Sequence, residues 1–241
     1  MGVAIVVPGG FMAIGILGGT FNPIHYGHLV AANEILEKFR LEKVILIPAA
    51  KPPHKDDRAI IDPHHRLIMA VLATVSNPAL IVSPMEIERE GISYSIETLR
   101  RLRQLYGAEV DLYFIAGIDA FLDVSTWKDV DQLFQQCHFI VISRPGYDTA
   151  HLLEVLGQTV SAKFNHLRFE LTPQLSPFGT QKILISETKY CIFLTGITAL
   201  DISSSEIRRR VREGRSIRYL LPKSVEDYIM KHRLYQGNDE I

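Results

Sequence analysis

Short apolar runs alternate along the chain with longer stretches in which apolar residues recur every three or four positions. The stretch 29–39 has this helical spacing, whereas the uninterrupted apolar runs have the length of buried strands. Strands that alternate with helices predict an α/β fold with a doubly wound parallel sheet. In such a sheet, ligands bind beyond the carboxyl ends of the strands, where the strand order reverses. The predicted strands are residues 14–17, 44–47, 80–82, 112–116, 139–142 and 192–194.

Residue types that start and stop helices mark the boundaries between these elements. The pair Asp62-Pro63 offers a cap and a first helical residue for a helix over 66–75. Ser95 is expected to cap a helix over 96–106, and Gly107 is expected to end it.

The chain between the fifth and sixth predicted strands shows less pattern. Residues 158–182 are rich in polar and turn-forming residues, and we interpret them as a loop or excursion because strand signals resume at Ile183. The wider stretch 147–199 is long, and its two interpretations are that it reshapes the rim of a ligand site or that it mediates self-association into a homo-oligomer.

The composition fits one large domain or two small ones. Of the 241 residues, 47% are hydrophobic, and the formal net charge of −1 gives no reason to expect nucleic acid or an acidic membrane as a partner. Cys137 and Cys191 lie in apolar runs, which indicates buried reduced thiols and a cytoplasmic protein. No apolar run reaches the roughly 20 residues of a membrane helix. Residues 1–12 are expected to be an N-terminal extension, and the lack of Lys and Arg before Met12 argues against a signal peptide.

A glycine turn with two histidines follows the first predicted strand. Gly18 and Gly19 end the strand, and His25 and His28 flank Gly27 at the start of the next helix. Glycines let a backbone approach an anion, and a helix start offers free N–H groups, so the run predicts a phosphate site. The alternatives are one capping and one surface histidine, or a zinc pair that no nearby Cys or carboxylate completes.

A second run near the C-terminus has related chemistry. Ser203, Ser204 and Ser205 open a helix, and Arg208 follows one turn later. Hydroxyls and a guanidinium at a helix start can hold an anion, although an ordinary serine cap explains the same residues. Two such sites on one sheet point to a polyphosphate held at both ends.

These runs resemble the H-x-G-H and I-S-S-S-x-I-R motifs of the nucleotidyltransferases. More narrowly, the chain is similar to the bacterial nicotinate-nucleotide adenylyltransferases over most of its length. The segments that carry this narrower resemblance are K-P-P-H-K at 51–55, S-Y-S-I-E-T-L at 93–99, G-I-D at 117–119 with Trp127, and S-R-P-G at 143–146.

The resemblance implies a Rossmann-like nucleotidyltransferase domain over 13–241, with a small helical part over 200–241 that carries the second motif. It also implies the reaction: the 5′-phosphate of nicotinate mononucleotide attacks the α-phosphorus of ATP, pyrophosphate leaves and deamido-NAD forms. His25 and His28 are the implied catalytic residues, acting on charge at the phosphates. No protein metal site is expected, and Mg²⁺ would arrive with ATP.

The resemblance also assigns binding residues. Trp127 would stack on the pyridine ring, backbone amides near Ser95 and Lys128 would take the nicotinate carboxylate, and Asp119 would accept from ribose hydroxyls. The ATP-binding set is Gly18, Gly19, Thr20, Phe21, Gly117, Asp119, Arg144, Ser203, Ser204, Ser205 and Arg208. The acceptor-binding set is Asn22, Lys55, Ser95, Thr98, Trp127 and Lys128.

Several of these residues have an ordinary structural explanation. Trp127 can be a core aromatic residue, Asp119 a helix cap and Lys55 a solvated loop lysine. Ser95 stands where the family usually has threonine, which keeps a hydroxyl at that position.

Two rival functions follow from the same residues. One is another transferase of the superfamily, acting on nicotinamide mononucleotide or phosphopantetheine. The other is nucleic-acid binding through the arginine-rich stretch 208–218, although a helix end that faces water explains that stretch better.

Overall fold

The computed structural model describes residues 12–53, 60–143 and 149–237. Its single sheet has eight strands in the order β3-β2-β1-β4-β5-β8-β7-β6. The six strands expected from the apolar runs are all present and run parallel, which confirms the predicted fold class. They are β1 (Ala13–Gly19), β2 (Lys43–Pro48), β3 (Leu80–Val82), β4 (Asp111–Gly117), β5 (His138–Ser143) and β8 (Cys191–Gly196).

Two antiparallel strands extend the sheet beyond β8. They are β6 (Phe169–Leu171) and β7 (Gln181–Ile185). The interpretation of 158–182 as a loop or excursion was therefore wrong in part, since this stretch contains β6 and the start of β7. The strand β6 is only three residues long and largely exposed, so no apolar run announces it in the sequence.

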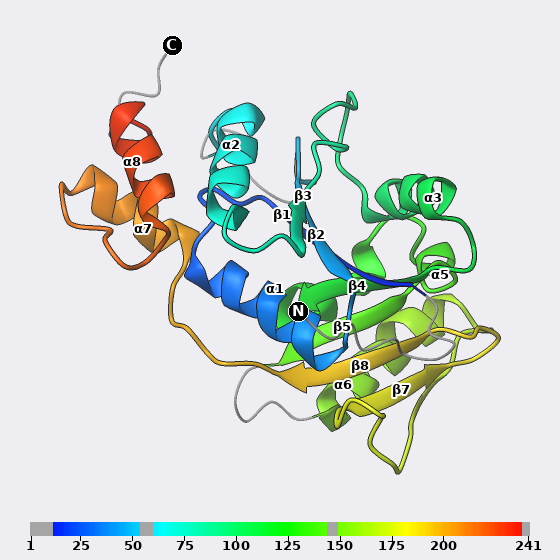
Figure 1. Cartoon of the computed structure of the whole chain (residues 1–241). Helices are drawn as coiled ribbons and strands as arrows, with labels where there is room; N and C mark the ends of the chain where they lie inside the picture. The colour runs from blue at the N-terminus through cyan, green and yellow to red at the C-terminus, as the bar shows by residue number, and fades with distance from the viewer. Residues whose placement is uncertain (1–11, 54–59, 144–148, 238–241) are drawn as a thin grey trace, which may run out of the picture.

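Helices cover both faces of the sheet, as Figure 1 shows. One face carries α1 (Tyr26–Lys38), α2 (Pro63–Thr74), α7 (Ser204–Arg212) and α8 (Lys223–Lys231). The other face carries α3 (Ser95–Tyr106), α4 (Ile118–Leu122), α5 (Val130–Leu133) and α6 (Thr149–Leu156). In Figure 1, α7 and α8 lie together at one end of the molecule beside α2.

The central strands are mainly apolar because both of their faces are buried. In β4, Leu112, Phe114 and Ala116 pack into the core on the α3 side, whereas Tyr113 and Ile115 pack into the core on the α1 side. A strand with side chains in two cores reads as a continuous apolar run.

The predicted helix signals hold at α2 and in part at α3. Asp62 caps α2 by accepting a hydrogen bond from the backbone N–H of His64 at 2.7 Å, and the helix begins at Pro63. Gly107, with φ of 82°, ends α3 as expected. Ser95 is not the cap of α3, because the helix begins at Ser95 and Tyr94 occupies the N-cap position without a side-chain cap bond. The Ser95 hydroxyl is therefore not used by the helix start.

Both cysteines are buried and unpaired, and burial raises the pKa of each thiol. This agrees with the expectation of inert reduced thiols. In the described part of the chain, no helix has the length and apolar character needed to cross a membrane. The expected N-terminal extension, apart from Met12, lies outside the described residues.

Candidate active site

The glycine turn lies where the strand order of the sheet reverses. Strand β1 has β2 on one side and β4 on the other, so the loop that leaves β1 after Gly19 opens into the crevice between their carboxyl ends. The loop runs through Asn22 to His25, which is the N-cap residue of α1. The motif thus lies at the place where a doubly wound sheet binds its ligands.

The two histidines pack against each other. Their ring centroids are 3.8 Å apart, and the backbone N–H of His25 donates to Nδ1 of His28 at 3.3 Å. His25 is only 6% exposed, and burial lowers its pKa to about 4, so its imidazole is neutral at pH 7. Its Nδ1 has no hydrogen-bond partner among the described residues. His28 is half-buried and faces the cavity described below.

Two glycines let this loop close on itself. A Cβ at Gly27 would lie 3.0 Å from the His25 ring, and a Cβ at Gly19 would lie 2.9 Å from the Phe21 ring. Phe21 has a φ of 48° and its ring meets His28 edge-on at 5.1 Å. The glycines are therefore required by close approach of side chains within the motif.

The second motif docks directly on this loop. The Ser204 hydroxyl donates to the carbonyl of Pro23 at 2.8 Å, and Nη1 of Arg208 donates to the carbonyl of Asn22 at 2.8 Å. Nη2 of Arg208 donates to the Ser205 hydroxyl at 3.3 Å. The two predicted phosphate-binding elements are thus neighbours, although some 180 residues separate them along the chain.

Ser203 has the structural role that its alternative interpretation assigned to it. It is the N-cap of α7, and its side chain accepts from the backbone N–H of Glu206 at 3.1 Å. The capped end of α7 is the end that contacts the histidine loop.

Two adjoining cavities open beside the glycine turn. The smaller, of about 340 Å³, is lined by residues from the ends of β1 and β4, including Gly18, Gly19, Thr20, Gly117 and His28. The larger, of about 550 Å³, lies between the start of α3 and the segment after α4. The walls they share are Pro53, Ser93, Ser95, Ala120 and Trp127.

Four of the predicted acceptor-binding residues line these cavities. Ser95 and Trp127 line both, Thr98 lines the smaller and Lys128 lines the larger. Trp127 is half-buried and meets Phe114 edge-on at 5.8 Å, so the core and cavity interpretations of this residue both describe part of its surface.

Two neighbouring side chains hold Lys128, which lines the larger cavity. Its Nζ donates to Glu97 Oε1 at 2.6 Å and lies 4.4 Å from the centroid of the Tyr94 ring. Glu97 also pairs with Arg89, so three charged side chains link the wall segments of this cavity.

Neither Asn22 nor Asp119 is among the residues that line the cavities. Asn22 is 4% exposed, and its Oδ1 accepts from the hydroxyl of Tyr235 at 2.9 Å, so it lies inside the protein and lines neither cavity. Asp119 is exposed in the first turn of α4, and its interpretation as a cap was wrong because Gly117 holds the N-cap position. Lys55 and Arg144 lie outside the described residues.

Arg66 organises the site although no sequence pattern marks it. Its side chain is fully buried in α2 and donates to the carbonyls of Thr20, Ala49 and Ala50 at 2.7, 2.6 and 3.0 Å. It therefore joins the loop after β1 to the loop after β2. In the sequence, Arg66 is a single arginine within a predicted helix, and nothing local distinguishes it from an arginine on the surface.

Glu86 is a second residue that the sequence did not reveal. It lines the smaller cavity, is 8% exposed, and accepts from the Thr98 hydroxyl at 2.5 Å. Burial raises the pKa of its carboxyl group. Glu86 fixes the orientation of the Thr98 hydroxyl, one of the predicted acceptor-binding groups.

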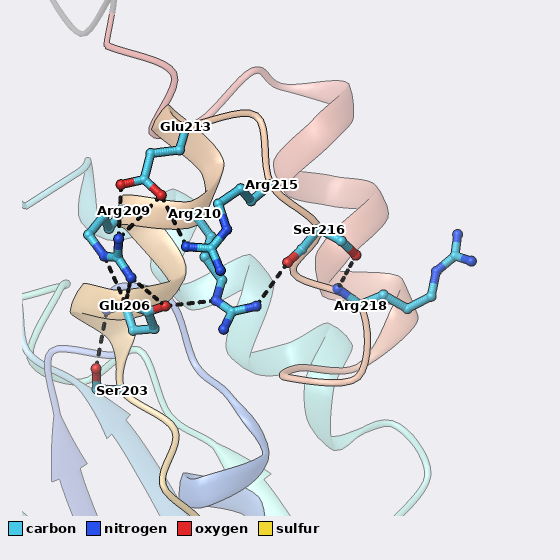
Figure 2. A network of polar contacts seen from close by, with 8 residues as sticks. All are labelled: Ser203, Glu206, Arg209, Arg210, Glu213, Arg215, Ser216 and Arg218. Carbon is cyan, nitrogen blue, oxygen red and sulfur yellow. Dashed lines mark hydrogen bonds and ion pairs between the residues drawn. The ribbon is translucent and has the colours of Figure 1, made fainter.

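The arginine-rich stretch forms an ion-pair network on the exposed side of α7, shown in Figure 2. Glu206 pairs with Arg209 and Arg210 at 2.7 and 2.8 Å, and Glu213 pairs with Arg209 and Arg215 at 2.9 and 3.2 Å. The hydrogen bond from Arg210, followed by that from Arg209, lowers the pKa of Glu206. This pairing favours a solvated helix face over a phosphate-binding surface.

The described residues contain no group of three or more His, Cys, Asp and Glu side chains that could hold a metal ion. The local basis for a zinc site at His25 and His28 is therefore lacking within this part of the chain. The chemistry available there is hydrogen-bond donation by imidazoles, backbone N–H groups, hydroxyls and a guanidinium.

The chain matches a family model and many curated proteins. Residues 16–210 match the cytidylyltransferase-like family. A protein of Thermoanaerobacter sp. (strain X514), named "Probable nicotinate-nucleotide adenylyltransferase", is 42% identical over 95% of this chain and 97% of its own length. A Moorella thermoacetica protein of the same name is 45% identical over 92% of this chain and 91% of its own length.

Among solved structures, the chain is similar to the Plasmodium falciparum nicotinic acid mononucleotide adenylyltransferase complexed with NaAD. The TM-score is 0.66 at 21% identity, over 94% of this chain and 98% of that one, which shows a shared fold. The curated relatives are similar enough to show the family. The chain belongs to the nicotinate-nucleotide adenylyltransferases within the cytidylyltransferase-like family.

Proposed function

We propose that this protein transfers AMP from MgATP to nicotinate mononucleotide, giving deamido-NAD and pyrophosphate in NAD biosynthesis. The observation that carries the proposal is the docking of the Ser204–Arg208 element on the histidine loop beside a cavity walled by Trp127. The relatives that bear the name of this enzyme, and a neighbour in fold complexed with NaAD, support it.

The reaction needs no nucleophile from the protein. An oxygen of the mononucleotide 5′-phosphate forms a bond to the α-phosphorus of ATP, while the bond from that phosphorus to the bridging oxygen of the β-phosphate breaks. The leaving pyrophosphate keeps the electron pair of the broken bond. Catalysis then consists of positioning and of stabilising negative charge on the phosphates.

The two histidines divide this work. His28 lines the smaller cavity and would donate to the α-phosphate. His25 packs against His28 and is neutral because it is buried. It would hold the His28 ring in place, and its own ring N–H would donate to the same phosphates. Ser203, Ser204, Ser205 and Arg208 would hold the β- and γ-phosphates.

The acceptor would occupy the larger cavity. The indole of Trp127 offers a flat face for the electron-poor pyridine ring, and backbone amides near Ser95 and Lys128 would take the nicotinate carboxylate. Nucleotidyl transfer generally uses a divalent metal with the nucleotide, and we assign Mg²⁺, which arrives with ATP and keeps most of its waters. Residence in the cytoplasm and self-association stay predictions.

The direct test is a pyrophosphate-release assay with purified protein, MgATP and one of three acceptors. Release with nicotinate mononucleotide, several-fold above that with nicotinamide mononucleotide and absent with phosphopantetheine, is the expected result. Release with phosphopantetheine alone would assign the chain to another acceptor. The same assay without acceptor controls for ATP hydrolysis.

A further inference from the structure

A tyrosine near the C-terminus reaches the histidine loop. Tyr235 follows α8, is 4% exposed and lies in the core on the α1 side of the sheet. Its hydroxyl donates to Oδ1 of Asn22 at 2.9 Å, across 213 positions of sequence. This bond is not part of either phosphate motif.

The backbone after α8 bends sharply to bring Tyr235 there. Arg233 and Tyr235 have φ values of 52° and 65°, in the left-handed region that bulky residues rarely adopt. Leu234, between them, is buried in the same core. A conformation of this kind persists only where surrounding contacts determine it.

Asn22 is the point at which several C-terminal contacts converge. Its carbonyl accepts from Arg208, and the next carbonyl, of Pro23, accepts from Ser204. The backbone N–H of Tyr26 donates to the carbonyl of Leu220 at 3.1 Å. Loop residues 22–26 are therefore held from the C-terminal side on both flanks of His25.

Two guanidinium groups hold backbone carbonyls of the same loop. Buried Arg66 donates to the carbonyl of Thr20, and half-buried Arg208 donates to that of Asn22. The side chains of Arg66, Arg208 and Tyr235 therefore all hold loop residues 20–22. Removal of the Tyr235 hydroxyl would leave the buried amide oxygen of Asn22 without that donor, and the loop would shift to find another.

We propose that Tyr235 is a positioning residue for adenylyl transfer, which acts through Asn22 to keep Arg208 and the two histidines directed at the same phosphates. This rests on the proposed function. A positioning residue of this kind changes kcat more than KM, because small displacements of donors weaken transition-state contacts most.

The test is Tyr235→Phe, which removes only the hydroxyl, beside the matched control Tyr228→Phe. Tyr228 lies in α8 and its hydroxyl bonds Nδ1 of His65 in α2 at 2.8 Å, so the control also removes one bond between the C-terminal region and the body of the protein. We expect Tyr235→Phe to lower kcat about 10- to 100-fold, with each KM within about twofold. The control should keep kcat within about twofold.

A double-mutant cycle and a readout without turnover complete the test. If Tyr235 acts through Asn22, adding Tyr235→Phe to Asn22→Ala should lower kcat no further. The imidazole NMR signals of His28 in the free protein should shift in Tyr235→Phe and not in Tyr228→Phe. These signals report loop positioning even if the acceptor is not nicotinate mononucleotide, so the two proposals fail separately.

Unchanged kcat and unchanged His28 signals in Tyr235→Phe would overturn the proposal. Equal losses in the two phenylalanine variants would also overturn it, because they would indicate general loosening of α8. If Tyr235→Phe does not fold, Asn22→Ala removes the acceptor of the same bond and its kcat and His28 signals are judged by the same criteria.

Discussion

At the scale of single residues, burial gives two neighbouring histidines different properties. His25 is enclosed and neutral, whereas His28 is half-buried and faces the cavity. Nothing in the sequence distinguishes the two histidines, which flank Gly27. Their difference is a matter of solvent access, which supports the proposed contact of His28 with substrate and the proposed supporting position of His25.

His28→Ala should lower kcat by about 10²–10³, the cost of one lost transition-state donor of about 3–4 kcal/mol. Pyrophosphate release measures the rate, and a thermal melt should show little change because His28 is not in the core. His64→Ala is the matched control, since His64 is exposed at the start of α2. An unchanged kcat would remove His28 from the mechanism.

Acid should destabilise the protein between pH 6.5 and 4. Burial lowers the pKa of His25 and of His138 to about 4, so in this window the unfolded chain takes up protons that the folded chain does not. The stability is fully present above pH 6.5 and is lost as the pH falls, by up to about 3 kcal/mol for each histidine. Urea unfolding at a series of pH values measures it.

His138→Gln tests the second of these contributions. Glutamine can still accept the hydrogen bond that the backbone N–H of Cys191 gives to His138 Nδ1 at 3.2 Å, but it does not titrate. The variant should lose about half of the pH dependence that His25 and His138 contribute together. A variant with the full wild-type pH dependence would contradict the assignment to His138.

At the scale of elements, the turn into α1 needs Gly19 and Gly27 because side chains approach them closely. Neither glycine has a positive φ. Gly27 lies under the His25 ring, and the carbonyl of Ile202 at the approach to α7 is 3.7 Å from where its Cβ would be. The glycine of the H-x-G-H motif is therefore explained by the close packing of the start of α1 against the approach to α7.

Gly27→Ala should displace the His25 ring and lower kcat at least tenfold while the protein stays folded, because the added methyl group would lie 3.0 Å from that ring. Gly157→Ala is the matched control, since a Cβ there meets nothing within 4 Å. The control should keep its activity and gain about 0.4–1 kcal/mol of unfolding free energy. Pyrophosphate release and urea unfolding separate the two effects.

At the scale of the whole molecule, the site is assembled at the strand-order reversal by segments that are far apart in sequence. Trp127, the one tryptophan of the chain, lines both cavities and packs its edge on the core aromatic residues of β4 and α4. Its position makes the intrinsic fluorescence of the protein a report on the cavities.

Titration with nicotinate mononucleotide should quench this fluorescence with a saturable dependence on concentration, because an electron-poor ring would stack on the indole. Trp127→Phe should keep the fold and raise KM for the mononucleotide several-fold, with a smaller change in KM for ATP. Fluorescence that does not respond to the mononucleotide would place the pyridine ring elsewhere.

The sequence by itself determined the six parallel strands, the approximate extents of α1, α2 and α3, and the two motifs that we propose to bind phosphate. These depend on apolar periodicity and on capping and glycine chemistry within a few neighbouring residues. The family resemblance also identified Trp127, Ser95 and Thr98, which the structure brings to the cavities.

Only the tertiary structure decided how the motifs meet, which histidine is enclosed, and which groups Arg66, Glu86 and Tyr235 contact. Asn22 shows the limit: the family resemblance assigned it to the acceptor, whereas the structure buries it against Arg208 and Tyr235. Contacts between residues so far apart leave no periodic pattern in the chain, and burial of a single charged side chain depends on the complete packing of the core. Such features follow from solvent exclusion by the whole fold, which no local stretch of sequence contains.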